Sequence, residues 1–210
     1  MDKSNKIKII SFTRCNELSL INEFDFTFVR FDLLEFADLN GFKDHHRVTD
    51  IEIKSVLKNI DAKIKLIVDV PDNIVFDKNL KKIFDFYIET KADVLGFNID
   101  FCDKSLIDYC LSKGLPLIIY SDNDKTDYDV LVSRLKEFDL LNIEFFILSR
   151  RKPEEISGIV NLLNTPIVAD VKTKSVGIYG KFSNLFGFSP ESTSKILNIN
   201  KEESFNTYEN

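Results

Sequence analysis

The side chains best suited to chemistry follow short apolar runs of the chain. Arg30 and Asp32 end one such run, and Asp69 ends the next. Later runs end in Asn98 and Asp100, Ser121 and Asp122, Ser149 and Arg150, and Asp170 with Lys172. If the runs are parallel strands, their carboxyl ends meet at one side of the sheet, where α/β enzymes hold their active sites. The sequence therefore predicts an acidic mouth that also carries arginine, asparagine and serine.

The aspartates of this mouth have two interpretations. Asp often ends strands and caps helices, so each carboxylate can have a structural role. Converging carboxylates can also bind a hard cation such as Mg²⁺ through oxygen ligands. The seven glycines form neither a G-x-G-x-x-G nor a P-loop motif, so a phosphate cofactor has little support. We expect no cofactor and assign no metal ligand.

Imidazole and thiol chemistry have few candidates. His45 and His46 are the only histidines, and adjacent residues point apart on a helix or strand, so they do not readily bind one metal. Acid–base chemistry must then use carboxylates, Lys, Tyr or Cys. The three cysteines, Cys15, Cys102 and Cys110, lack a C-x-x-C spacing, and we expect packing thiols of a reducing compartment.

Apolar runs and amphipathic stretches alternate along the chain. The runs predict strands at residues 7–12, 26–31, 66–70, 94–97, 117–120, 145–148, 166–169 and, more weakly, 185–188. Helical periodicity falls at residues 49–60, 80–90, 105–113, 128–138 and 153–163. Continuous apolar runs such as 117–120 and 145–148 indicate burial on both faces, which is typical of parallel strands covered by helices.

This alternation predicts an α/β fold. We favour a (β/α)8 barrel over an open doubly wound sheet, because an open sheet usually has a glycine-rich first turn. One compact domain would span residues 1–200, and residues 201–210 would form a polar tail.

Charge and hydropathy limit the classes of partner that the protein can bind. The formal charge of −6 lacks the basic excess that nucleic-acid binding needs. No apolar run reaches the length of a membrane span, and the polar residues 1–6 do not form a signal peptide. We expect a cytoplasmic protein with a small-molecule ligand and no nucleic-acid or membrane partner. Whether it forms a homodimer is left open.

Several segments, in order, resemble the type I 3-dehydroquinate dehydratases, (β/α)8 lyases of the shikimate pathway of aromatic amino acid biosynthesis. The matching segments are FVRFDL at 28–33, ADVLGFN at 92–98, LIIYSDND at 117–124, PIV at 166–168 and LFG at 185–187. The resemblance implies a Schiff-base lysine on the sixth strand, a catalytic histidine and a glutamate.

The implied catalytic residues are not retained. The lysine position falls at Phe145 or Phe146, the histidine at Asp122 and the glutamate at Asn98. Arg30 keeps the family's substrate-binding arginine. The resemblance thus implies a divergent homologue with lost or altered imine chemistry, whose substrate-binding positions are Arg30, Asn98 and Asp122. Arg30 can bind an oxyanion there, or it can pair structurally with Asp32 or another carboxylate.

Two other functions stay open. The segment VKTKSVG at 171–177 resembles the lysine strand of deoxyribose-phosphate aldolases, which would make Lys172 a Schiff-base nucleophile. The second alternative is a non-catalytic barrel that serves as a binding or interaction protein. An apolar plug of Phe28, Phe145 and Phe146 at the mouth would favour this binding protein. An open site around Arg30 and Asp122 would favour an altered ligand.

Overall fold

A computed structural model describes residues 7–12, 27–31, 58, 62–70, 85, 87–88, 90–122, 125–171 and 185–190. Its strands are β1 (Ile7–Phe12), β2 (Phe28–Phe31), β3 (Lys65–Asp69), β4 (Val94–Asn98), β5 (Leu117–Ser121), β6 (Phe146–Ser149), β7 (Ile167–Val171) and β8 (Leu185–Pro190). The helices among these residues include α5 (Lys104–Ser112), α6 (Tyr128–Asp139) and α7 (Pro153–Val160).

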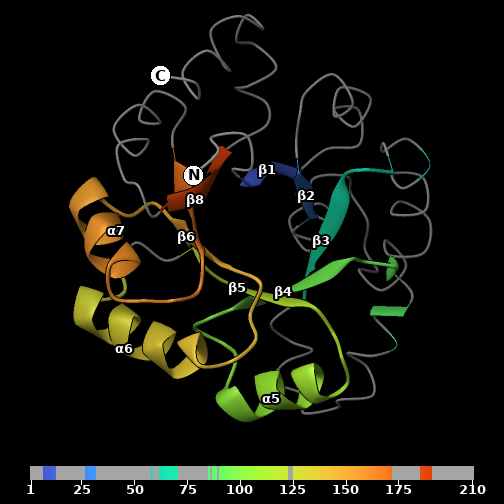
Figure 1. Cartoon of the computed structure of the whole chain (residues 1–210), viewed down its shortest axis with the longest axis horizontal. Helices are drawn as coiled ribbons and strands as arrows, with labels where there is room; N and C mark the ends of the chain where they lie inside the picture. The colour runs from blue at the N-terminus through green and yellow to red at the C-terminus, as the bar shows by residue number, and fades with distance from the viewer. Residues whose placement is uncertain are drawn as a thin grey trace, which may run out of the picture.

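The strands form one parallel sheet in chain order. Each strand pairs with the next, and β8 returns to pair with β1, so the sheet curls round on itself. Figure 1 shows the strands at the centre with α5, α6 and α7 outside them. The predicted parallel α/β fold is confirmed. The finer prediction of an eightfold (β/α) repeat needs connecting helices that lie largely outside the described residues.

Alternate residues of each strand face two different cores. One core packs strand residues such as Val29 and Phe97 against helix residues such as Leu131 and Ile156. The other core contains only strand positions and Phe145, and it fills the space that the strands enclose. Burial on both faces therefore explains the continuous apolar runs, as the sequence predicted.

Aromatic side chains fill the amino-terminal end of this inner core. Phe28 begins β2, Phe145 directly precedes β6, and their rings meet edge to face at 5.3 Å between centroids. Lys65 Nζ lies 5.9 Å from the Phe28 ring centroid. Phe146 belongs to the outer core. The three phenylalanines therefore do not plug the carboxyl-terminal mouth, because two lie at the opposite end and one faces the helices.

Helix caps explain where the described helices begin. Asp103 Oδ1 accepts a hydrogen bond from the Leu106 N–H at 2.8 Å at the start of α5. Asp127 caps α6 in the same way. Helix α7 begins at Pro153, whose missing N–H costs nothing in the first turn. These starts lie within one residue of those predicted from the sequence.

Several sequence predictions lie outside the described residues. These are the tail at 201–210, Cys15, Asp32, His45, His46 and Lys172, together with most of the helices predicted at 49–60 and 80–90. Among the described residues, no helix has the length and apolar character needed to cross a membrane. The nucleic-acid, homodimer and cytoplasmic expectations stay predictions.

Candidate functional site

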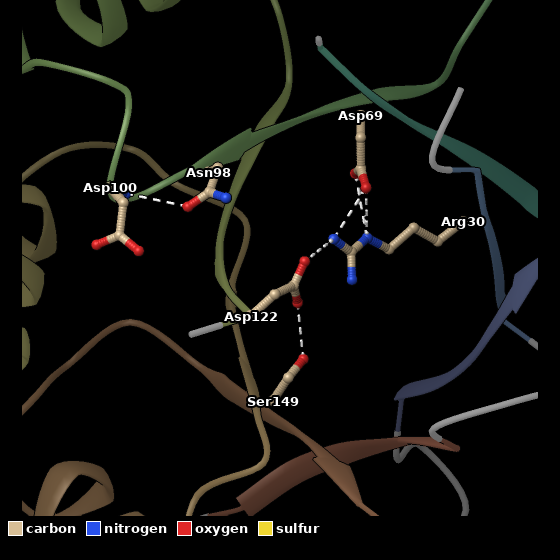
Figure 2. Close-up of polar contacts among 6 residues, drawn as sticks. All are labelled: Arg30, Asp69, Asn98, Asp100, Asp122 and Ser149. Carbon is tan, nitrogen blue, oxygen red and sulfur yellow. Dashed lines mark hydrogen bonds and ion pairs between the residues drawn. The ribbon is translucent and has the colours of Figure 1, made fainter. Parts of the chain in front are cut away.

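Arg30 forms the centre of the candidate site. It lies on β2, where the alternation of the strand turns it inward, two residues beyond Phe28 toward the carboxyl end. Its Nε donates to Asp69 Oδ2 at 2.9 Å, and its Nη2 lies 2.8 Å from the same oxygen. Nη2 also lies 3.4 Å from Asp122 Oδ2, as Figure 2 shows. Strands β2 and β3 and the end of β5 thus converge on one guanidinium.

The guanidinium is buried, with Tyr120 against its planar face and Asp69 and Asp122 at its edges. Arg30 is 5% exposed, and its Cζ lies 4.1 Å from the Tyr120 ring centroid. Burial alone would lower the pKa of Arg30, but the charges of Asp69 and Asp122 outweigh it and raise the pKa well above its ordinary value. Arg30 therefore stays charged at neutral pH.

One nitrogen of Arg30 is left over. Neither carboxylate takes Nη1, which makes no hydrogen bond to any other described residue. In Figure 2 this nitrogen points away from Asp69. Hydrogen bonds from a charged guanidinium are among the strong ones, so such a nitrogen gains when an acceptor comes within reach. Nη1 is therefore suited to bind an acceptor oxygen of a ligand.

Asp122 is the accessible carboxylate of the site. It directly follows β5, and its side chain is 46% exposed, whereas that of Asp69 is 4% exposed. Ser149, the last residue of β6, donates its hydroxyl to Asp122 Oδ1 at 2.8 Å. Asp122 is thus oriented from two sides and still reachable, as a carboxylate that exchanges protons with a ligand must be.

Asn98 adds a second donor, which is neutral. Its Oδ1 accepts the Asp100 N–H at 3.0 Å, which fixes the amide orientation, because only the oxygen can accept. The amide nitrogen must then point the other way. In Figure 2 it lies on the side of Arg30, Asp69 and Asp122.

The structure separates the remaining mouth residues predicted from the sequence. Ser121 pairs in register with Leu148 of the outer core, and its buried hydroxyl finds no partner among the described residues. Arg150 is exposed in a left-handed conformation with φ 59°. Asp170 lies in β7, but its side chain is not among those that the structure describes. The sequence missed Tyr120 as the stacking partner and the choice of Asp69 as the main partner of Arg30.

The charge balance limits what this site can bind. Among the described residues, one guanidinium against two carboxylates leaves a local charge of −1. Within the described ranges, no group of three or more His, Cys, Asp or Glu side chains is arranged to hold a metal ion. Arg30 occupies the position between Asp69 and Asp122 where a cation would have to bind. A ligand that brings both acceptor oxygens and a hydroxyl donor fits better.

Comparisons with known proteins bear on the fold. No family model matches the chain, and no curated protein is significantly similar to it in sequence. Among solved structures, orotidine 5′-monophosphate decarboxylase from Methanocaldococcus jannaschii in complex with the inhibitor BMP superposes with a TM-score of 0.67 at 12% identity, over 97% of each chain.

Two further structures come from lyase and hydrolase enzymes. A 2,3-dimethylmalate lyase of the PEP mutase/isocitrate lyase superfamily has a TM-score of 0.62 at 11% identity, over 98% of this chain and 90% of its own. Phosphonopyruvate hydrolase has a TM-score of 0.65 at 10% identity, over 93% and 79%. At such identities the likeness establishes a TIM-barrel-type fold and nothing more specific.

The resemblance to type I 3-dehydroquinate dehydratases is wrong. The similar structures include a member of the PEP mutase/isocitrate lyase superfamily and orotidine 5′-monophosphate decarboxylase. The assignment to a shikimate-pathway dehydratase, active or decayed, is withdrawn with it. The error has a physical cause: buried parallel strands select the same short apolar patterns in unrelated barrels, so segment order alone does not identify a family.

Proposed function

We propose that the chain completes a (β/α)8 barrel and is a lyase or mutase that acts on a small hydroxy acid at the carboxyl ends of its strands. One observation carries the proposal. Among the described residues, the buried Arg30 has no partner for Nη1, and its guanidinium lies beside the half-exposed Asp122 carboxylate. An acceptor oxygen of a ligand and a hydroxyl of the same ligand can therefore be bound together.

Binding uses complementary donors and acceptors. Arg30 Nη1 and the Asn98 amide nitrogen donate to the two oxygens of the substrate carboxylate. The substrate hydroxyl donates to Asp122, which offsets the unfavourable approach of an acid to a site of charge −1. A ligand that has only a carboxylate lacks this second contact and should bind more weakly.

The reaction follows from the same contacts. Asp122 takes the hydroxyl proton of a β-hydroxy acid, the bond between the carbinol carbon and the α-carbon breaks, and a carbonyl product forms. The electron pair moves onto the α-carbon and the carboxylate oxygens, where Arg30 and Asn98 stabilise the charge. The proton on Asp122 then returns to the α-carbon. In a mutase, the two fragments would recombine before they leave.

Two other observations support a lyase without an imine. The inward positions in the carboxyl-terminal half of β2 to β6 hold no lysine: they are Arg30, Asp69, Asn98, Tyr120 and Ser149. Among the similar structures, 2,3-dimethylmalate lyase is named for a hydroxy acid. The fold therefore accommodates such chemistry elsewhere, and the present site has the groups to perform it.

The test is a product assay with defined compounds. The purified chain is incubated with 2,3-dimethylmalate, malate and phosphonopyruvate, and cleavage or rearrangement is followed by ¹H and ³¹P NMR. We expect conversion of at least one hydroxy acid, and loss of conversion in Arg30→Lys, whose compact ammonium cannot reproduce the planar fork that bonds Asp69 and faces the substrate. Wild-type protein that neither binds nor converts a hydroxy acid would contradict the proposal.

A further inference from the structure

The backbone of β4 leaves a space that Asp69 uses. Gly96 lies opposite Asp69 in the register of β3 and β4. A Cβ atom at Gly96 would overlap Asp69 Oδ1 and would lie 3.3 Å from Asp69 Cγ and 3.5 Å from Tyr120 Cδ1. The only glycine with positive φ among the described residues is Gly114, so the backbone at Gly96 is one that alanine can adopt. The absence of a side chain, rather than backbone freedom, is what the site requires there.

The consequence reaches Arg30 through Asp69. Any side chain at position 96 must move the Asp69 carboxylate, which is 3% exposed and has no solvent to enter. Arg30 Nε and Nη2 would then lose their main partner, and the guanidinium would turn toward Asp122, the other carboxylate within reach. In that orientation Nη1 is no longer reserved for a ligand.

We propose that Gly96 is a positioning residue: it admits the Asp69 carboxylate and so determines which edge of Arg30 faces the substrate. The inference rests on the proposed function for its ligand. The geometric part, from Gly96 through Asp69 to Arg30, stands independently and can be measured in the free protein.

A second glycine provides a matched control. A Cβ atom at Gly158 of α7 would overlap the Tyr128 hydroxyl oxygen of α6, so Gly158→Ala also forces a polar side-chain tip to move. Gly158 lies in the helix layer, remote from Arg30. The two substitutions therefore add the same methyl group in similar steric conflicts, and only one of them concerns the site.

The first experiment observes Arg30 directly. Hydrogen exchange of the arginine Nε–H groups is followed by ¹⁵N NMR, and Arg30, one of six arginines, is assigned by Arg30→Lys. We expect Gly96→Ala to speed exchange at Arg30 roughly tenfold or more, because the bond to Asp69 is weakened. Gly158→Ala should leave it at the wild-type rate. Wild-type exchange in Gly96→Ala would overturn the inference.

The second experiment keeps the inference testable where Gly96→Ala folds poorly. In the Arg30→Met/Asp69→Ala background the carboxylate that the methyl overlaps is gone, and an apolar pair replaces the ion pair. We expect Gly96→Ala to lower the urea midpoint in the wild-type background and to leave it unchanged in this one. An equal decrease in both backgrounds would show that the methyl acts elsewhere.

Binding of 2,3-dimethylmalate tests both the proposed function and the positioning role of Gly96, and it shows which of the two fails. If wild-type protein binds this acid, Gly96→Ala should weaken binding roughly tenfold and Gly158→Ala should not. Undiminished binding to Gly96→Ala would overturn the positioning role alone. If wild-type protein does not bind the acid, the proposed function fails, while the exchange result on Arg30 still decides the role of Gly96.

Discussion

Ser149 and Asp122 meet at the mouth, where the Ser149 hydroxyl donates to Asp122 Oδ1 at 2.8 Å. Ser149 ends β6, and Asp122 follows the neighbouring strand β5. The hydroxyl orients one carboxylate oxygen, and Arg30 Nη2 lies 3.4 Å from the other. These two contacts fix the orientation of the Asp122 carboxylate, which we propose as the base, although nearly half of its side chain is exposed.

Replacing Asp122 should separate catalysis from stability. Asp122→Asn removes the proton acceptor and keeps the size of the side chain, so turnover of 2,3-dimethylmalate should fall about 10²- to 10⁴-fold. The urea midpoint should hardly change, because exposed ion pairs contribute about 0 to 1 kcal/mol. Full activity of Asp122→Asn would exclude Asp122 as the base.

Ser149→Ala tests the orientation of this base. The carboxylate remains, but one oxygen loses its hydrogen bond, so turnover should fall by about tenfold, as expected when about 1 to 1.5 kcal/mol of interaction is lost. Ser121→Ala is the matched control, because the Ser121 hydroxyl has no partner among the described residues. Equal turnover in both variants would argue against a role for Ser149.

Asp69 should govern stability. Among the described residues, Asp69→Ala leaves the buried guanidinium with the more exposed Asp122 as its one carboxylate partner, and the loss of one partner of a buried pair costs about 3 to 5 kcal/mol. Urea unfolding measures the loss, with Asp108→Ala on the exposed side of α5 as the control. The double variant Arg30→Met/Asp69→Ala should recover most of the stability, since no unpaired charge remains.

Asp139 makes folding sensitive to acid. Its carboxylate accepts hydrogen bonds from the Asn164 and Thr165 N–H groups at 2.9 and 2.7 Å, which joins the end of α6 to the start of β7. Partial burial would raise the pKa of Asp139, but these hydrogen bonds outweigh it and lower the pKa below 3.8. The stabilisation is therefore present above pH 3.8 and is lost as the pH falls through the lower folded pKa.

Asp139→Asn provides the measurement of that linkage. At neutral pH it should cost about 1 to 2 kcal/mol of unfolding free energy, because a charged acceptor is replaced by a neutral one. Acid unfolding curves between about pH 5 and pH 2 should converge for wild type and variant as Asp139 protonates. A constant difference across this range would contradict the role of the charge.

Two cysteines should be unreactive in the folded chain. Burial raises the pKa of Cys102 to about 12 and that of Cys110 to about 11, so almost no thiolate exists at neutral pH. In a Cys15→Ser variant, a thiol-specific disulfide reagent should label neither residue until urea unfolds the protein. Rapid labelling before unfolding would show that the helix layer around α5 opens.

The strands, several helix starts and the polar character of the mouth could be predicted from the sequence. Each depends on local information: a run of four or five apolar residues, a capping Asp, or a proline in a first turn. Arg30, Asn98 and Asp122 were predicted to share one mouth because parallel strands end at one edge. The prediction that they bind substrate is still to be tested.

Only the tertiary structure decided which partners meet. Arg30 and Asp69 are 39 residues apart, and their contact depends on the register of β2 and β3 and on the space above Gly96. Neither quantity leaves a pattern in the residues near Arg30, and for that reason Asp32 was as plausible a partner from the sequence. The family was misjudged for a related reason: apolar strands are selected by burial, which many barrels share, whereas the arrangement of polar groups at their ends arises only when the sheet curls.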